Sequence, residues 1–187
     1  MKKMAIFASG TGSNAQKIID HFRKNDYGKV QLIVCNNASA GVLQIASSEN
    51  IKALLIERNK FMSTGYVSEF KSDGIEFIVL AGFLWKVPEI LIASFPGKII
   101  NIHPALLPAH GGKGMYGSAV HNAVINAKEK QSGITIHYVD EKYDHGKIIF
   151  QKKCDISEDD TAQSLAKKIY LLEHKYYAEE IEKILKQ

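Results

Sequence analysis

The sequence predicts a doubly wound α/β fold with a mostly parallel sheet. Short apolar segments alternate with segments of helical period through the first hundred residues. The apolar segments are continuous, as expected of strands that are buried on both faces of a parallel sheet. We expect strands at Met4–Ala8, Val30–Cys35, Ala53–Ile56, Phe77–Leu80 and Lys98–Ile102. We expect helices between them at Ser13–Arg23, Gly41–Ser48, Phe61–Phe70 and Pro88–Ser94.

A different pattern follows residue 108. The segment Ala109–Gly117 holds four of the chain's 14 glycines and predicts a loop, which a helix follows at Ser118–Lys130. Two further apolar segments, Ile134–Val139 and Lys147–Lys153, flank a turn signal at residues 143–146. This arrangement predicts an antiparallel strand pair.

The tail of the chain predicts one long helix, from residue 160 or 161 to about Leu185. Its apolar residues recur at helical spacing and form an expected core stripe of Leu165, Ile169, Leu172 and Tyr176. We therefore expect a Rossmann-like sheet with an antiparallel C-terminal strand pair and a long C-terminal helix. No repeat or linker interrupts the chain, so residues 1–187 are expected to form a single domain.

The composition is that of an ordinary globular protein, with 45% hydrophobic and 24% charged residues and a net charge of +4. The lysines are scattered, without the basic stripe and interleaved aromatics of a nucleic-acid surface. No apolar run approaches the roughly 20 residues of a membrane span. The apolar stretch near the N-terminus is too short for a signal peptide, so a cytoplasmic location is expected. Cys35 lies in an apolar run and is expected to be a buried free thiol.

A glycine-rich segment, Ser9–Ala15, follows the first predicted strand and opens the first helix. Its glycines permit a tight turn close to a ligand, and the helix start offers N–H groups to an anion. The spacing matches the dinucleotide fingerprint, but the second strand ends Cys35-Asn36-Asn37, without the acidic residue that contacts ribose in NAD sites. A phosphate monoester therefore fits better than NAD. A plain tight turn capped by Ser13 or Asn14 is the alternative.

Two polar side chains end the fifth predicted strand. Asn101 and His103 are two residues apart and point to the same face, whereas Ile102 points to the opposite face. Pro104 has no N–H and should end the strand pairing. An amide and an imidazole therefore share the carboxyl end of a strand, where open α/β sheets bind their ligands.

Asp144 lies in a second polar segment, Asp140–Gly146, which can fold back over the same sheet edge. A carboxylate beside an imidazole orients the ring and raises its pKa. A turn aspartate that precedes a glycine is the alternative. The remaining histidines lack metal-ligand spacing, so we expect no metal. An amide and an imidazole without a Ser or Cys nucleophile suit acyl transfer, in which donors hold an oxyanion while a proton moves.

Four motifs together resemble the folate-dependent formyltransferases, and within them the phosphoribosylglycinamide (glycinamide ribonucleotide) formyltransferases. The motifs are Ser9–Asn14, Leu80–Phe83, Asn101–Pro108, and the pattern of Asp140, Asp144 and Gly146. The resemblance extends to about Glu173. The Asn-x-His-Pro run is typical of folate-dependent formyltransferases in general, and the early glycine loop favours the purine enzyme.

The resemblance implies roles for the matching residues. Asn101, His103 and Asp144 match the catalytic amide, imidazole and aspartate, and Asp144 is expected to favour the charged imidazole. The residues that match ribonucleotide contacts are Gly12, Ser13 and Asn14, which hold the phosphate, and Glu173. The residues that match the folate pocket are Leu84, Trp85, Lys86, Val87, Asn101, Val139 and Asp140. Residues 1 to about 100 would then form a phosphate-binding half, and residues 101–187 a catalytic and folate-binding half.

The sequence also departs from the family pattern. The Ala109–Gly117 loop is longer and richer in glycine than the usual loop, so no role is carried over to it. Thr64 stands where a folate-contacting arginine is expected, and little chain follows Glu173.

The implied activity is formyl transfer from 10-formyltetrahydrofolate, a co-substrate, to the amine of 5-phosphoribosylglycinamide in de novo purine biosynthesis. The expected partners are these small molecules, with no nucleic acid and no membrane, and the protein is expected to be a monomer or homodimer. The alternatives are a formyltransferase for methionyl-tRNA or an amino sugar, a deformylase, and a nucleotide-sensing module without catalysis. The tRNA enzyme and the deformylase would need an additional domain, for which 187 residues leave no room.

Overall fold

The computed structural model describes all 187 residues, which divide into two compact units. One unit comprises residues 1–100 and 178–187, and the other comprises residues 101–177. Two elements contribute residues to both units: strand β5 (Ile99–His103) and helix α7 (Ala162–Leu185). The division of the chain into functional halves stays a prediction.

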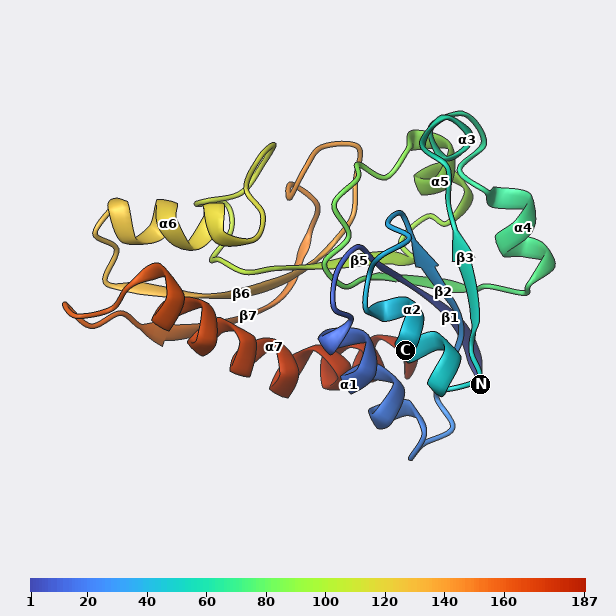
Figure 1. Ribbon diagram of the computed structural model, residues 1–187, viewed down its shortest axis with the longest axis horizontal. Coiled ribbons are helices and arrows are strands. Elements are labelled where there is room, and N and C mark those ends of the chain that lie inside the picture. Colours follow the sequence, from blue (N-terminus) through green and yellow to red (C-terminus); the bar gives the residue numbers. More distant parts are fainter. The chain divides into compact units, whose positions relative to one another are not determined.

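The first unit is a parallel sheet with helices on both faces (Figure 1). Its strands are β1 (Lys2–Ala8), β2 (Gly28–Cys35), β3 (Lys52–Leu55) and β4 (Phe77–Leu80). β1 pairs in parallel with both β2 and β4, and β2 pairs in parallel with β3. The strand order β3-β2-β1-β4-β5 reverses direction between β1 and β4, which is the switch point where doubly wound sheets bind ligands.

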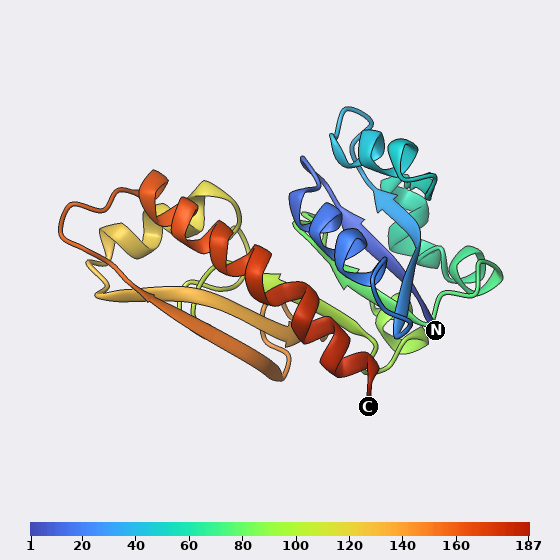
Figure 2. The same ribbon diagram turned by 90° about the horizontal axis from the view of Figure 1, so that it is seen from below.

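Five short helices cover this sheet: α1 (Ser13–Phe22), α2 (Val42–Ser48), α3 (Arg58–Thr64), α4 (Val67–Ser72) and α5 (Glu89–Ser94). α1 and α2 lie on one side of the strands, and α3 and α4 lie on the other (Figures 1 and 2). An aromatic cluster fills the second side, where the Phe7 ring lies 5.5 Å from Phe70 and 5.3 Å from Phe83 between centroids.

The second unit contains an antiparallel strand pair and two helices. β6 (Gln131–Tyr138) pairs with β7 (Ile148–Asp155), and α6 (Ser118–Asn126) precedes them. The strand order here is β5-β6-β7. Leu165 and Ile169 of α7 are buried, as are Ile134 and Ile136 of β6.

The predicted fold class is confirmed: the sheet is mostly parallel, ends in an antiparallel pair and is followed by a long C-terminal helix. Cys35 is buried and both cysteines are free. None of the helices combines the length and the apolar character needed to cross a membrane.

Three details of the prediction were wrong. The single helix expected at Phe61–Phe70 is two helices, because Gly65 (φ 59°) and Tyr66 (φ 53°) adopt left-handed conformations that end α3. The helix expected to reach Lys130 ends at Asn126, and Lys128 is again left-handed. On α7 the fully buried tyrosine is Tyr177, whereas Tyr176 is only partly buried.

Candidate active site

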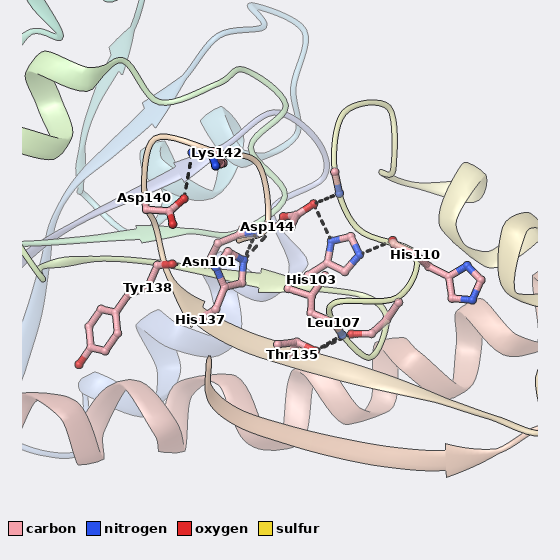
Figure 3. Close-up of polar contacts among 12 residues, drawn as sticks. Asn101, His103, Leu107, His110, Thr135, His137, Tyr138, Asp140, Lys142 and Asp144 are labelled. Carbon is pink, nitrogen blue, oxygen red and sulfur yellow. Dashed lines mark hydrogen bonds and ion pairs between the residues drawn. The ribbon is translucent and has the colours of Figure 1, made fainter. Parts of the chain in front are cut away.

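Asn101 and His103 lie on the last residues of β5, and Pro104 follows where the strand ends. Ile102 is buried on the opposite face, as the alternation of a strand requires. Figure 3 shows both polar side chains directed toward Asp144, which reaches them from the turn after β6. The structure therefore brings the three predicted catalytic residues into one group within the second unit.

Asp144 is the centre of this group. One carboxylate oxygen lies 3.5 Å from His103 Nδ1 and accepts a hydrogen bond from the Gly112 N–H at 2.9 Å. The other oxygen lies 3.6 Å from His137 Nε2. Asp144 has a positive φ of 53°, which aspartate tolerates better than most residues. The backbone of the turn thus aims the carboxylate between two imidazoles.

His137 is a member of the site that sequence reasoning missed. It is 2% exposed, and its Nδ1 lies 2.8 Å from the Tyr138 carbonyl oxygen, which can only accept. Nδ1 therefore carries the proton, and Nε2 accepts from Asn101 Nδ2 at 3.2 Å. This contact orients the Asn101 amide. The sequence carried one signal for it: Thr135 and His137 alternate with the buried Ile134 and Ile136, so they share one face of β6.

The His103 ring is buried, and burial has the largest influence on its pKa. Loss of water around the ring lowers the pKa of His103 below its usual value, although the Asp144 charge and the hydrogen bond to His110 act to raise it. Asp144 thus favours the charged imidazole, as expected, but burial outweighs it, so the net shift of the His103 pKa is downward. Burial also acts to raise the pKa of Asp144, but its contacts with His137 and His103 lower it overall.

The glycine-rich loop at residues 109–117 contacts both His103 and Asp144. His103 Nε2 donates to the His110 carbonyl oxygen at 2.8 Å, and Gly112 donates to Asp144. A Cβ on Gly111 would lie 2.4 Å from a Leu107 methyl carbon and 3.2 Å from Asp144 Cβ, so a larger residue there would force the Leu107 side chain to move. The sequence predicted the loop but gave it no role.

A buried hydroxyl, that of Thr135, holds the segment that follows His103. Thr135 Oγ1 donates to the Ala105 carbonyl at 2.7 Å and accepts from the Leu107 N–H at 3.0 Å. Gln151 of β7 donates to both Thr135 Oγ1 and the Leu107 carbonyl, each at 2.9 Å. These bonds satisfy polar groups that burial would otherwise make costly.

The predicted phosphate loop lies in the first unit, between β1 and α1. Gly12 has φ 83°, and a Cβ there would lie 2.8 Å from side-chain atoms of Val42 and Ile45. No side chain caps α1, which begins at Ser13 and continues through Asn14. A helix start without a side-chain cap is suited to an anion, because its first N–H groups need acceptors.

Ser9 links this loop to the segment after β4. Its Oγ accepts a hydrogen bond from the Leu84 N–H at 3.0 Å, and its N–H donates to the Gly82 carbonyl at 3.1 Å. Leu84 is exposed, Trp85 and Lys86 are partly buried and Val87 is buried. The predicted phosphate loop and the predicted folate segment Leu84–Val87 are therefore joined at the switch point of the first unit. The glycine-rich motif includes Ser9, but nothing in the sequence indicates this linking role.

The other predicted residues lie in the second unit. Val139 and Asp140 follow β6 directly. Burial acts to raise the pKa of Asp140, but hydrogen bonds from His145 and the Lys142 N–H lower it overall. Glu173 is on α7 and is partly buried. Its charge adds to burial in raising the pKa of Tyr177.

The buried group at the end of β5 combines donors and a carboxylate without a nucleophile. Asn101 and His103 supply N–H donors, and Asp144 can accept or direct a proton. Nowhere do three or more His, Cys, Asp or Glu side chains gather so that they could hold a metal ion. Such a set is suited to holding a developing oxyanion and moving a proton.

Comparison with known proteins agrees with this chemistry. A model of the family described as formyl transferase matches residues 2–181. The chain is 40% identical over 185 residues to the chloroplastic phosphoribosylglycinamide formyltransferase of Arabidopsis thaliana, covering 95% of this chain. It is 36% identical to the Bacillus subtilis phosphoribosylglycinamide formyltransferase, covering 99% of this chain and 95% of the relative.

A solved structure gives the same result. The phosphoribosylglycinamide formyltransferase of Bacillus halodurans superposes with a TM-score of 0.90 at 35% identity, covering 98% of this chain and 95% of that one. The chain spans 63% of the Arabidopsis protein and 62% of its Vigna unguiculata counterpart. The family model nevertheless covers almost every residue described above, and the chain therefore belongs to the formyl transferase family.

Proposed function

We propose that this chain transfers a formyl group from 10-formyltetrahydrofolate to the amine of 5-phosphoribosylglycinamide, giving formylglycinamide ribonucleotide and tetrahydrofolate in de novo purine biosynthesis. The observation that carries the proposal is the buried group of Asn101, His103, His137 and Asp144 at the end of β5. The names of the relatives that match nearly the whole chain support the same reaction.

In this reaction the neutral amine attacks the formyl carbon, and a carbon–nitrogen bond forms as the carbonyl oxygen becomes an oxyanion. The bond from the formyl carbon to N10 of the folate then breaks, and the proton lost by the amine passes to N10. Asn101 Nδ2–H and His103 Nε2–H stabilise the oxyanion, and Asp144 orders a water that relays the proton. Donors held in a buried site act strongly on a developing charge.

His103 enters the reaction as a neutral imidazole, because burial lowers its pKa. Its Nε2–H is satisfied by the His110 carbonyl at 2.8 Å. The formyl oxygen must take the place of that carbonyl, so the loop has to release His103 when substrate binds. Any proton that reaches Nδ1 faces the Asp144 carboxylate at 3.5 Å, which stabilises the charged ring as it forms.

The residues proposed to bind the substrates are those that the resemblance to the family assigns to them. Gly12, Ser13 and Asn14 hold the ribonucleotide phosphate, supported by the uncapped start of α1, and Glu173 contacts the ribonucleotide. The folate contacts are Leu84, Trp85, Lys86, Val87, Asn101, Val139 and Asp140. The exposure of Leu84 and the partial burial of Trp85 support this assignment.

Absorbance of the deformylated folate tests the proposal. The purified protein is mixed with glycinamide ribonucleotide and a 10-formyl folate, and with each alone. Turnover that requires both substrates is expected. Loss of the formyl group without the amine would instead indicate the deformylase. Tight NAD binding without folate binding would indicate the sensor, and turnover only with methionyl-tRNA or an amino sugar would indicate those formyltransferases.

Substitution of the oxyanion donors tests the mechanism. Asn101→Ala and His103→Ala are each expected to lower kcat by about 10²–10³, as removal of one such donor does. His21→Ala is the matched control, because His21 pairs with Glu182 within the first unit and contacts none of Asn101, His103 and Asp144. Near-normal turnover by either active-site variant would refute the assigned roles.

The compartment and assembly are also proposals. We place the protein in the cytoplasm as a monomer or homodimer that binds small molecules and no nucleic acid. The plant relatives are named chloroplastic, so fractionation of the source cells is the direct test of location. Sedimentation of the purified protein tests the oligomeric state.

A further inference from the structure

The turn that carries Asp144 is fixed at its base. It joins β6 to β7 and comprises residues 139–147. The Tyr138 N–H donates to the Lys147 carbonyl at 2.9 Å, and Gly146 packs so closely on this strand end that a Cβ there would lie 1.9 Å from the Tyr138 carbonyl oxygen. Residues 141–143 are exposed. These contacts close the turn, but they leave the position of Asp144 to other interactions.

The Asp144 side chain has few contacts of its own that hold it in place. The Gly112 N–H donates to its carboxylate at 2.9 Å. The ring nitrogens of His103 and His137 lie at 3.5 and 3.6 Å, which is longer than an ordinary hydrogen bond. The φ of 53° at Asp144 is left-handed, a conformation that residues other than glycine keep when their surroundings enforce it. The backbone beside Asp144 therefore needs support.

Asp140 supplies this support from across the turn. Figure 3 shows Asp140 and Asp144 on opposite arms of the turn, with Lys142 between them. One Asp140 oxygen accepts from the Lys142 N–H at 2.9 Å, and the other lies 2.9 Å from His145 Nδ1. A carboxylate can only accept, so Nδ1 carries the proton. His145 follows Asp144 directly in the chain, and its contact with Asp140 therefore ties the backbone next to Asp144 to the opposite arm.

His145 reaches the group at the end of β5 by this route alone. Its side chain is 65% exposed and pairs with Asp140, and it forms no hydrogen bond or ion pair with Asn101, His103 or His137. An exposed pair of this kind adds little to the stability of a fold. An effect of His145 on the reaction would therefore pass through the position of Asp144.

We propose that His145 is a positioning residue, whose hydrogen bond to Asp140 keeps the Asp144 carboxylate between His103 and His137. When this bond is lost, the arm of the turn that carries Asp144 relaxes from its left-handed backbone and withdraws the carboxylate from both rings. The proposal rests on the proposed function, because it takes Asp144 as part of the reacting group.

Two substitutions of His145 test the hydrogen bond by kinetics. His145→Leu removes the donor, and kcat is expected to fall about three- to fivefold, the scale of an exposed pair. His145→Asn keeps an N–H donor on the same side-chain carbon as Nδ1 and is expected to recover most of the rate. The KM values for both substrates are expected to change less than kcat. Lys142→Ala is the matched control, because it removes a cation from the same turn and keeps the backbone N–H that Asp140 accepts.

Nuclear magnetic resonance of labelled histidine rings tests the position of Asp144 in the ligand-free protein. The Asp144 charge raises the pKa of His103 against the effect of burial. Withdrawal of the carboxylate in His145→Leu is therefore expected to lower the pKa of His103, as Asp144→Asn does. Loss of a cation from the turn would act in the opposite direction. The other titratable groups near His103, which are His110, His121 and His137, are the same in every variant.

Three outcomes would overturn the proposal. A wild-type kcat together with a wild-type His103 pKa in His145→Leu would leave His145 as a surface side chain without influence on the site. Equal losses in the Leu and Asn variants would assign the effect to the imidazole ring rather than to its hydrogen bond. A loss in Lys142→Ala as large as that in His145→Leu would assign the effect to the charge of the turn.

The fate of the proposed function is distinguishable from these results. The His103 titration requires neither substrate nor catalysis. If the wild type does not transfer a formyl group but the His103 pKa falls in His145→Leu and not in His145→Asn, the proposed reaction fails and the positioning of Asp144 stands. If the wild type is active and the His103 pKa is the same in all variants, the reaction stands and the positioning role fails.

Discussion

At the scale of single residues, burial and hydrogen-bond geometry determine what the polar group at the end of β5 can do. His103 and His137 are both buried and both face Asp144, but they serve different purposes. His103 presents an N–H to the His110 carbonyl, whereas His137 presents a lone pair to the Asn101 amide. The two rings are thus held in opposite hydrogen-bonding states by their neighbours.

The ionisation of His103 can be predicted from its surroundings. Burial lowers its pKa, and the Asp144 charge partly opposes that shift. The ring is therefore expected to be neutral at pH 7 and to take up a proton only below its usual titration range. Asp144→Asn removes the opposing charge and is expected to lower the pKa of His103 further. Nuclear magnetic resonance of labelled histidine rings measures both values, and a rise in Asp144→Asn would contradict the argument.

His137 is predicted to position Asn101. His137→Leu removes the acceptor that orients the Asn101 amide, and kcat is expected to fall roughly tenfold, the scale of one hydrogen bond. His137→Gln retains a side-chain acceptor and is expected to recover part of the rate. Thermal unfolding of both variants separates positioning from folding. Equal kcat in the Leu and Gln variants at equal stability would exclude this role.

At the scale of elements, the site depends on how strands and helices begin and end. β5 ends at His103 because Pro104 follows, and α1 starts at a left-handed Gly12. Both boundaries were predictable from residue type. The break between α3 and α4 was missed: Gly65 at the end of α3 is a helix-stop signal, but the positive φ of Tyr66 has none in the sequence.

Gly12 is predicted to be irreplaceable, unlike the glycine two residues earlier. Gly12→Ala places a Cβ 2.8 Å from Val42 and Ile45 and forces a left-handed conformation, which costs about 1–2 kcal/mol before any steric clash. We expect a lower melting temperature and a higher KM for glycinamide ribonucleotide. Gly10→Ala is the control, because a Cβ at Gly10 would meet nothing within 4 Å. Equal effects in the two variants would contradict the prediction.

Thr135 is predicted to stabilise the turn after His103. Thr135→Val keeps the shape of the side chain but leaves the Leu107 N–H and the Gln151 amide without their shared partner. An unsatisfied buried polar group costs about 1–3 kcal/mol. Denaturant unfolding should show that the free energy of unfolding of Thr135→Val falls by this amount. Thr64→Val, at an exposed helix end, should lower the free energy of unfolding much less. A loss no larger than that of Thr64→Val would argue against the network.

At the scale of the whole molecule, two elements belong to both compact units. β5 carries Asn101 and His103 at its end in the second unit, and the last residues of α7 belong to the first unit. Within the first unit, Ile181 and Leu185 are buried, and Glu182 pairs with His21 at 2.5 Å.

Removal of residues 178–187 is therefore predicted to destabilise the first unit. Exposure of the sites filled by Ile181 and Leu185 should cost roughly 3–6 kcal/mol, from the usual value for a buried aliphatic side chain. Trp85, the only tryptophan, lies in the first unit and reports its unfolding by fluorescence. A control that lacks only residues 186–187 should melt close to the wild type. An unchanged Trp85 transition in the longer truncation would refute the prediction.

The sequence by itself determined the fold class, the antiparallel pair and the shared face of Asn101 and His103, because strand alternation, prolines and glycines act locally along the chain. The tertiary structure alone decided that burial lowers the pKa of His103, that His137 orients Asn101, and that the His110 carbonyl accepts the Nε2–H hydrogen bond of His103. Each of these depends on burial or on contacts made through the folded backbone. Local patterns predict elements, but only the packed chain determines desolvation and which side chains meet.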